Sequence, residues 1–414
     1  MQDRPDTTHL IHHPYTPPRD FEAPQPGVFK ASTVYFPNVA AMRAREWKNK
    51  TAYTYGLHGT PTTYTLEERL CALEGGAQCV LVPSGLAAIA NTALALLQTG
   101  DEVLIPDNAY GPNKALAEGE LRHWGITHRC YDPMDPDDLA SMISERTRLV
   151  WLEAPGSVTM EFPDLIALVC LCRERGVLCA LDNTWGAGLA FAPFDLLGDG
   201  SLGVDISVHA LTKYPSGGGD VLMGSIVTRD DALHLKIKLC HMRLGLGVGA
   251  NDVEAVLRAL PSIGLRYAAQ DQTARALAHW WHQQPQCVQV LHPALPGAPG
   301  HAHWLALCAP QGSEGSEGSE GSEGRAAGLF SVVLAPRYSQ AQVDAFCDGL
   351  QRFRIGYSWG GPVSLVVPYD LASMRTRAHP QLQAGHLVRF SMGLESAQAL
   401  QDDLGAALAR HMPL

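Results

Sequence analysis

Short apolar runs alternate with helical patterns between residues 79 and 224, and this alternation restricts the possible folds more than any other feature of the chain. We expect buried strands at residues 79–82, 101–106, 149–152 and 178–181, and helices at residues 87–97 and 163–175. Such alternation is typical of a parallel sheet with helices on both faces. An α/β fold is therefore predicted, with binding groups at the carboxyl ends of the strands.

The length of 414 residues exceeds one ordinary domain, so we expect more than one lobe. After Gly224 helical patterns dominate. We predict an N-terminal arm over residues 1–60, an α/β domain over 61–255 and a smaller α+β domain over 256–414. Residues 312–324 hold four Gly-Ser-Glu triplets, which are expected to form a solvated loop because they cannot bury a core.

The composition restricts which classes of molecule the protein can bind. A formal net charge of -11 without any Lys/Arg-rich run argues against a nucleic-acid surface. No apolar run is long enough to span a membrane, and the first residues lack the apolar core of a signal peptide. The ten scattered cysteines are expected to be reduced core residues, and the absence of a C-x-x-C pair argues against a metal site. We therefore expect a cytoplasmic protein that binds small molecules or other protein chains.

Lys213 follows an apolar run and precedes a glycine-rich turn. A lysine that is desolvated close to other cationic groups is neutral often enough to attack a carbonyl. Upstream, a predicted strand ends at Asp182, and a carboxylate there can hydrogen-bond a protonated pyridine nitrogen. Taken alone, a Thr-Lys pair also suits a surface lysine at a strand end. The order of the parts favours an amine that binds pyridoxal phosphate (PLP) as a Schiff base.

A phosphate site is predicted where a strand, a tight turn and a helix follow one another over residues 79–90. Free backbone N–H groups at the start of a helix bind phosphate, so Ser84, Gly85 and Leu86 are the candidate ligands. Strand, phosphate turn, acid and lysine thus follow in the order that PLP enzymes of the aspartate aminotransferase fold type use.

Several motifs narrow this interpretation. They are Tyr55-Gly56-Leu57-His58-Gly59-Thr60-Pro61-Thr62, Asp107-Asn108-Ala109-Tyr110, Asp182-Asn183-Thr184-Trp185, Thr212-Lys213-Tyr214, Tyr357-Ser358-Trp359-Gly360-Gly361 and Arg389-Phe390-Ser391-Met392-Gly393-Leu394-Glu395. On these residues the chain resembles the Cys/Met-metabolism PLP-dependent enzyme family from about residue 28 to about residue 410. Within that family the motifs are most similar to those of bacterial cystathionine β-lyases.

The resemblance implies the PLP-dependent transferase fold (aspartate aminotransferase-like, fold type I). It also implies catalytic roles for Lys213 and Tyr110, whose ring can stack on the pyridine ring. The implied cofactor ligands are Lys213, Ser84, Gly85, Leu86, Tyr110, Asp182, Thr212 and Tyr55. In the family the N-terminal arm reaches a neighbouring subunit, so Tyr55 is expected on the phosphate of a partner chain. This implies a homo-oligomer with shared active sites, a dimer or a tetramer.

Arg389 lies among apolar neighbours in a predicted strand at residues 386–391. A buried guanidinium demands an anion. In the resembling enzymes that anion is the α-carboxylate of the substrate, so Arg389 is assigned to substrate binding together with Ser358, Trp359 and Tyr55. The alternative is a structural salt bridge to an acid in the same lobe.

Three positions depart from the family pattern. Leu57 stands where the family usually carries an arginine that binds phosphate through two hydrogen bonds. His58 beside it is a weaker substitute. Ala210 replaces a serine common three places before the lysine, and Val363 replaces a glutamate common after the Gly-Gly pair. We therefore expect weaker phosphate binding than in the family and an altered specificity pocket.

The implied reaction is a carbon–sulfur lyase step: β-elimination of L-cystathionine to homocysteine, pyruvate and ammonia, in methionine biosynthesis by transsulfuration. Residues 155–161 and Trp359 favour β-elimination. A cystathionine γ-synthase or γ-lyase, or a methionine γ-lyase, remains an alternative because the same electron sink serves γ-chemistry. A hypothesis of another class is a PLP-bound regulatory scaffold without catalysis, which would not need Lys213, Asp182, Tyr110 and Arg389 together.

Overall fold

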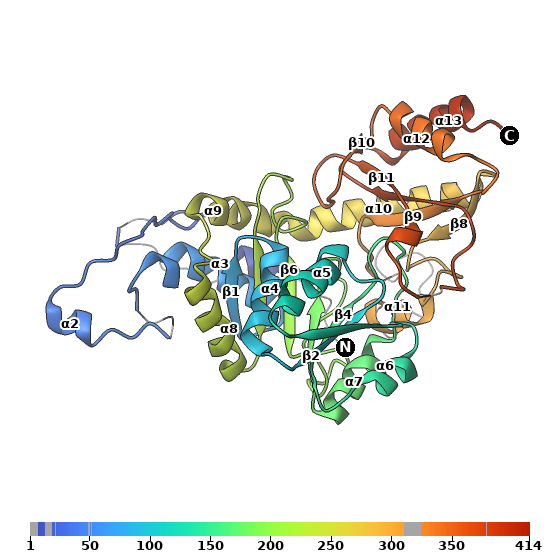
Figure 1. The fold of residues 1–414 in the computed structure, drawn as a ribbon. Helices are drawn as coiled ribbons and strands as arrows, with labels where there is room; N and C mark the ends of the chain where they lie inside the picture. The colour runs from blue at the N-terminus through green and yellow to red at the C-terminus, as the bar shows by residue number, and fades with distance from the viewer. Residues whose placement is uncertain are drawn as a thin grey trace.

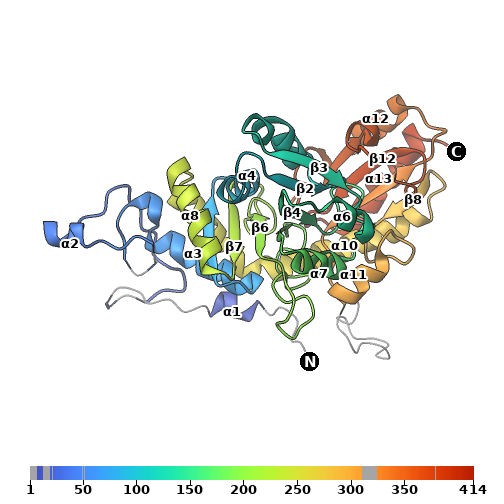
Figure 2. The same ribbon diagram turned by 60° about the horizontal axis from the view of Figure 1, so that its bottom comes forward.

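The computed structural model describes residues 7–12, 19–20, 22–48, 50, 52–309, 324–377 and 379–414 (Figure 1). Parts of the predicted N-terminal arm and almost all of the predicted Gly-Ser-Glu loop lie outside the described residues. Where the chain is described, residues 22–48 extend away from the rest of the molecule, with α2 (Val39–Arg43) at the far end in both views (Figures 1 and 2).

A large sheet forms the centre of the first lobe. Among the described residues it has seven strands in the order β1-β7-β6-β5-β4-β2-β3. Their bounds are β1 Gln78–Val82, β2 Glu102–Pro106, β3 Thr127–Tyr131, β4 Thr147–Glu153, β5 Leu178–Asp182, β6 Ile206–Ala210 and β7 Gly224–Thr228. The pairs β2·β3, β2·β4, β4·β5 and β5·β6 are parallel, whereas β7 runs antiparallel to both β1 and β6. The predicted, mostly parallel α/β sheet is confirmed.

Helices cover both faces of this sheet (Figures 1 and 2). They are α3 Pro61–Glu74, α4 Gly85–Leu96, α5 Gly111–Leu116, α6 Pro136–Met142, α7 Leu165–Arg175, α8 Asp231–Leu244 and α9 Ala250–Ala259, with the short turns η1 Gly56–His58, η2 Ala117–Leu121 and η3 Leu260–Ser262. Side chains of β5 alternate between two cores, since Cys179 and Leu181 face one and Ala180 faces the other. A strand that is buried on both faces is apolar throughout, so the apolar run at residues 178–181 correctly predicted a strand.

Three strands of the large sheet had no predicted range: β6, which is the apolar run before Lys213, β3 and β7. β3 lies at an edge and alternates exposed with less exposed residues, so it has no apolar run. β7 is fully buried, but it follows Gly224, where we expected the alternation to stop. It pairs with β1 and β6, which are distant from each other in the chain, and local patterns carry no signal for such pairing.

The second lobe contains a five-stranded sheet, again counted over the described residues, in the order β10-β11-β12-β9-β8. Its strands are β8 Cys287–Leu291, β9 Leu329–Leu334, β10 Arg354–Ile355, β11 Leu365–Tyr369 and β12 His386–Ser391. The helices around it are α10 Ile263–His282, α11 His301–Cys308, α12 Gln340–Gly349 and α13 Ala397–His411, with η4 Leu371–Ser373. The strand predicted at residues 386–391 is present with those bounds.

The long helix α10 joins the two lobes (Figure 1). Tyr267 near its start packs in the core of the large sheet, and Leu277 further on packs in the core of the small sheet. Val256 and Leu257 also belong to the first core. The packing therefore favours a domain boundary within α10. The boundary at residue 255 stays a prediction.

Candidate active site

Lys213 lies in the turn that follows β6, at the carboxyl end of the strand. Its Nζ donates a hydrogen bond to Ser358 Oγ at 2.9 Å and lies 5.4 Å from the centre of the Trp359 ring. Both partners come from the loop between β10 and β11 of the second lobe. The predicted lysine thus meets two of the predicted substrate-binding residues across the boundary between the lobes.

The environment makes Lys213 neutral more often near pH 7 than an ordinary lysine. Burial, followed by the positive charge of Arg389, lowers the pKa of Lys213 to about 8, while Asp182 opposes this shift. At pH 7 about one amine in ten is then neutral, against fewer than one in a thousand for an ordinary lysine. Such an amine can attack an aldehyde or accept a proton near neutral pH.

Arg389 lies on β12 and is only 6% exposed. Its guanidinium donates to the Ser358 carbonyl at 3.3 Å, and its Nε has no hydrogen-bond partner. Over the described residues no carboxylate lies within ion-pair distance of Arg389, so the predicted alternative of a structural salt bridge finds no support there. A buried cation in this situation is suited to an anionic ligand.

Ser358 connects the two cations, because its hydroxyl accepts from Lys213 and its carbonyl accepts from Arg389. Its backbone has a φ of 113°, in a region that a residue with a side chain rarely occupies. A residue held in such a conformation stores strain, and such strain gathers at functional sites. The loop is thus shaped so that one residue serves both groups.

Asp182 ends β5, where Glu153 of β4 is its neighbour in register. The Thr184 hydroxyl donates to Asp182 Oδ1 at 2.5 Å, and the Thr184 N–H donates to the same oxygen at 3.1 Å. Burial raises the pKa of Asp182, and the two hydrogen bonds from Thr184 lower it in part. A buried carboxylate of this kind can pair with a protonated ring nitrogen.

Tyr110 lies at the start of α5, after β2 has ended. Its backbone N–H donates to Glu153 Oε2 at 2.8 Å, and its side chain is 42% exposed. Burial, with Asp182 next and then Glu153, raises the pKa of Tyr110, so its hydroxyl stays protonated at neutral pH. Glu153 therefore positions the backbone of Tyr110.

The predicted phosphate turn forms the start of α4. The Ser84 hydroxyl accepts from the Ala87 N–H at 3.0 Å and caps the helix. Gly85 is required here, because a Cβ at this position would lie 2.5 Å from Ala210 Cβ. The first N–H groups of a helix have no partner within it, so those of Gly85 and Leu86 are available to an anion. The Thr212 hydroxyl instead accepts a hydrogen bond from the Met223 N–H at 3.3 Å and donates one to the Met223 carbonyl at 3.4 Å.

Tyr55 lies apart from these residues. It pairs with Thr33 through an isolated β-bridge, its ring is 5.7 Å from the His58 ring, and it is 44% exposed. No contact between Tyr55 and Lys213, Asp182 or Arg389 is found within the described part of the chain. Its assignment to a partner chain stays a prediction, as does the assignment of the other site residues.

Two residues of the site were missed by the sequence reasoning. Tyr369 of β11 packs its ring 5.3 Å from the Arg389 guanidinium, and Thr184 holds Asp182. Thr184 was quoted within a motif but received no role. No strand was predicted around Tyr369. Its position beside Arg389 comes from the pairing of β11 with β12.

Comparison with known proteins identifies the family. The sequence pattern of the Cys/Met metabolism PLP-dependent enzymes matches residues 7–409. The chain belongs to this family. A Rhizobium johnstonii protein described as a putative cystathionine beta-lyase is 36% identical over 387 residues, 93% of this chain and 91% of that protein. Escherichia coli cystathionine beta-lyase MetC is 32% identical over 417 residues, 99% of this chain and 100% of that protein.

Solved structures agree with the fold. Cystathionine gamma synthase from Xanthomonas oryzae pv. oryzae, in complex with aminoacrylate and cysteine, is 28% identical, with a TM-score of 0.83 over 99% of both chains. The predicted PLP-dependent transferase fold and the predicted cofactor are thereby confirmed. This chain is a PLP-dependent enzyme of Cys/Met metabolism.

The residues present fit PLP. An amine with a pKa of about 8 lies at one strand end, and a buried carboxylate lies at the neighbouring strand end. The start of α4 offers the N–H groups of Gly85 and Leu86 to a phosphate, and the missing side chain at Gly85 lets this turn pack against Ala210. Within the described residues no helix combines the length and apolar character needed to cross a membrane.

Proposed function

We propose that this enzyme is a cystathionine β-lyase, which converts L-cystathionine and water to homocysteine, pyruvate and ammonia in methionine biosynthesis. The observation that carries the proposal is the convergence of Lys213 and Arg389 on Ser358. Ser358 links Lys213, whose pKa is lowered, to Arg389, a buried cation without a counter-charge among the described residues. An amino acid whose carboxylate occupied Arg389 would bring its Cα toward Lys213.

The proposed roles follow from this geometry. Arg389 binds the α-carboxylate, and Ser358 and Trp359 hold Lys213 and the substrate beside it. Lys213 accepts the proton from Cα as general base. The bond between Cβ and sulfur then breaks, and the electron pair leaves with the sulfur as the thiolate of homocysteine. Tyr110 presents its ring to the cofactor, and Tyr55 of a second chain binds near the substrate.

PLP, when bound, supplies an electron sink for the carbanion at Cα. Asp182 would hold the ring nitrogen protonated, and Lys213 would anchor the aldehyde carbon. The phosphate would lie at the start of α4, held by Ser84, the N–H groups of Gly85 and Leu86, Thr212 and Tyr55. We further propose a cytoplasmic homo-oligomer, with active sites shared in a dimer and dimers paired into a tetramer.

β-Elimination is preferred for two reasons. The two relatives named above are described as β-lyases, and Trp359, whose motif resembles that of the β-lyases, lies against Lys213. The second candidate is γ-chemistry, because the Xanthomonas oryzae structure of the same fold is a γ-synthase. Both reactions need Lys213 and Arg389, so these residues do not separate them.

The products separate the candidates. Purified protein would be incubated with L-cystathionine, and pyruvate and 2-oxobutyrate would be measured by chromatography. Pyruvate with homocysteine is expected, whereas 2-oxobutyrate with cysteine would show γ-elimination instead. Lys213→Ala should retain the fold and lose nearly all turnover and the yellow absorbance of lysine-bound PLP, while Lys236→Ala, at an exposed position of α8, should behave as wild type. Turnover by Lys213→Ala at the wild-type rate, or no turnover by wild type, would contradict the proposal.

A further inference from the structure

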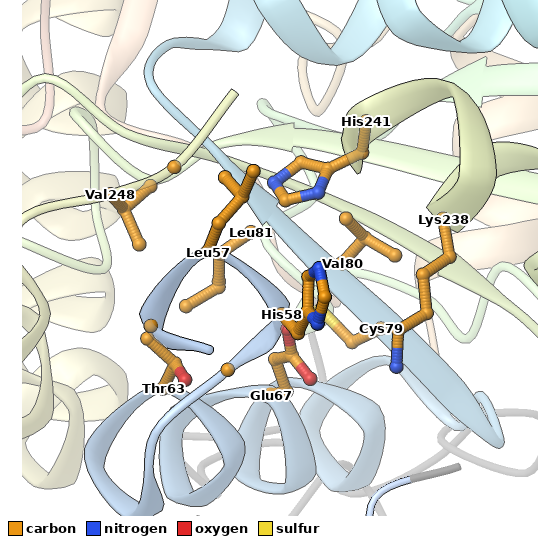
Figure 3. A pocket seen from close by; sticks show the side chains of 13 residues that line it. Leu57, His58, Thr63, Glu67, Cys79, Val80, Leu81, Lys238, His241 and Val248 are labelled. Atoms are coloured by element: carbon orange, nitrogen blue, oxygen red, sulfur yellow. The ribbon is translucent and has the colours of Figure 1, made fainter. Parts of the chain in front are cut away.

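A pocket separate from the proposed active site lies between η1, α3, β1 and α8 (Figure 3). Four of the side chains that line it can carry charge: His58, Glu67, Lys238 and His241. Within the described residues, none of Lys213, Asp182, Tyr110 and Arg389 lines this pocket. The roles proposed above therefore do not account for Glu67, Lys238 and His241, and His58 entered only as a weak substitute for a phosphate-binding arginine.

Lys238 is the group that most needs explanation. It is 5% exposed, and its Nζ has no hydrogen-bond partner. Its side chain extends from α8 toward the side of the pocket where His58, Cys79 and Glu67 lie (Figure 3). The Tyr64 ring, with its centre 5.9 Å from Nζ, gives only a weak contact. A buried ammonium without a counter-charge is unfavourable, so the pocket calls for an anion.

The carboxylate that lines the pocket is already paired. Glu67 Oε2 lies 2.7 Å from Lys50 Nζ, which also donates to the Cys79 carbonyl at 3.2 Å. Two ammonium groups therefore face one carboxylate, and one positive charge is left over. Glu67 still acts on Lys238 at longer range: burial lowers the pKa of Lys238, Glu67 raises it and Lys50 lowers it again.

The imidazoles of His58 and His234 experience the same positive charges, whereas for His241 burial lowers the pKa and Glu67 raises it ahead of the lowering by Lys238. Burial, followed by the charges of Lys238 and Arg45, lowers the pKa of His58. Burial, followed by Lys50 and Lys238, lowers the pKa of His234 to about 3. The Nδ1 of His58 is engaged with the Thr54 hydroxyl at 2.8 Å, which leaves its Nε2 for a ligand. With histidines neutral, the net charge around the pocket is positive.

The size of the cavity selects the class of ligand. Its volume is about 30 Å³. A cavity needs roughly 10–15 Å³ to accept one water molecule, so this one has room for a single small ion but not for a phosphate or a carboxylic acid. One wall is the η1 turn, which follows Tyr55 directly, so an ion here would anchor that turn.

We propose that this pocket binds a monatomic anion, chloride under ordinary conditions, between the Lys238 ammonium and the His58 ring. The ion supplies the counter-charge that Lys238 lacks and ties α8 to η1. The site is independent of cystathionine chemistry, so the proposed function and the anion site stand or fall separately.

Thermal unfolding of the PLP-bound protein tests the proposal. Wild type, Lys238→Met and the matched control Lys236→Met, an exposed lysine on the same helix, would be compared in sodium chloride and in sodium gluconate of equal ionic strength. Gluconate is too large for the cavity. We expect chloride to raise the Tm of wild type and Lys236→Met by about 2 °C or more, as saturation of one site predicts. Lys238→Met should have the same Tm in both salts.

Bromide provides a second readout that does not depend on the variant. Crystals of wild type grown or soaked in sodium bromide should show an anomalous scattering peak in the cavity within hydrogen-bond distance of Lys238 Nζ. A water molecule there with no bromide peak would overturn the proposal. So would a wild-type Tm that is equal in the two salts, or a chloride response of Lys238→Met as large as that of wild type.

Discussion

Lys213 Nζ donates to Ser358 Oγ at 2.9 Å, although 145 residues separate them in the chain. The bond joins the proposed base to a loop of the second lobe. A hydroxyl that accepts from an ammonium group stabilises the charged form. The bond thus favours the charged amine, whereas burial and Arg389 lower the pKa of Lys213.

Replacing Ser358 with alanine should therefore lower the pKa of Lys213 below about 8 and weaken the position of its amine. We expect kcat/KM to fall about tenfold, the effect of one hydrogen bond to a charged group. The bond from Arg389 to the Ser358 carbonyl would remain, so KM should change less than kcat. Steady-state kinetics check this against Ser373→Ala, an exposed serine of the same lobe. Equal loss in both variants would contradict the assignment.

Uptake of PLP by the cofactor-free protein should depend on pH through Lys213. Only the neutral amine attacks the aldehyde. With a pKa of about 8, the rate of uptake should rise roughly tenfold per pH unit up to about pH 8 and then level off. Stopped-flow absorbance measures this rate, with Lys213→Ala as the control that takes up no lysine-bound PLP. A rate that climbs on toward pH 10 would mean an ordinary lysine.

Sequence reasoning found the residues whose signal is local. Lys213, Asp182 and the phosphate turn follow buried strands, and hydrophobic periodicity reveals such strands directly. The order of these parts along one sheet then predicted that their side chains meet at its carboxyl edge. Arg389 was found in the same way, as a charged residue inside an apolar strand.

The remaining contacts depend on segments that are distant in the chain. Tyr369 contacts Arg389 only because β11 pairs antiparallel with β12, and Ser358 reaches Lys213 only because the two lobes pack together. Tyr55 differs from both, because its proposed role depends on contact with a second chain and not on packing within one chain. Register and lobe packing arise from tertiary interactions, which no pattern within one segment encodes.

Thr184→Val should move the acidic limb of the pH profile. The Thr184 hydroxyl stabilises the ionised form of Asp182, so its loss should raise the pKa of Asp182 further above the ordinary range. The carboxylate would then be protonated at higher pH, and kcat/KM should begin to fall at higher pH than in wild type. The pH dependence of kcat/KM measures the shift. Thr127→Val, at an exposed threonine of the same sheet, should leave the profile unchanged.

Tyr369 should matter for substrate binding more than for turnover. Its ring faces the Arg389 guanidinium at 5.3 Å, which keeps the cation oriented toward the site. In Tyr369→Leu we expect KM for cystathionine to rise roughly three- to tenfold with little change in kcat, while Tyr369→Phe retains the ring and stays near wild type. A fall in kcat alone would place Tyr369 in the chemical step instead.

Arg375 fastens the loop between β11 and β12 to the first lobe through a buried ion pair with Glu161 at 2.9 Å. Burial alone would raise the pKa of Glu161, but Arg375 and hydrogen bonds from Thr159 and Asn108 hold it below its ordinary value. Arg375→Met leaves a buried carboxylate unpaired and should destabilise the protein by about 3–5 kcal/mol at neutral pH. Because the folded pKa of Glu161 is depressed, this contribution is present above about pH 4 and is lost as pH falls through the folded pKa.

Chemical denaturation at pH 7 and at lower pH measures the effect of Arg375→Met. The control is the double variant Arg375→Met with Glu161→Gln, which removes both charges and should be more stable than Arg375→Met alone. If the single and double variants lost the same stability, Glu161 would not be the reason that Arg375 is needed. Loss of the pair should also loosen the contact of Thr376 with Asp107, which lies three residues before Tyr110, so kcat should fall together with stability.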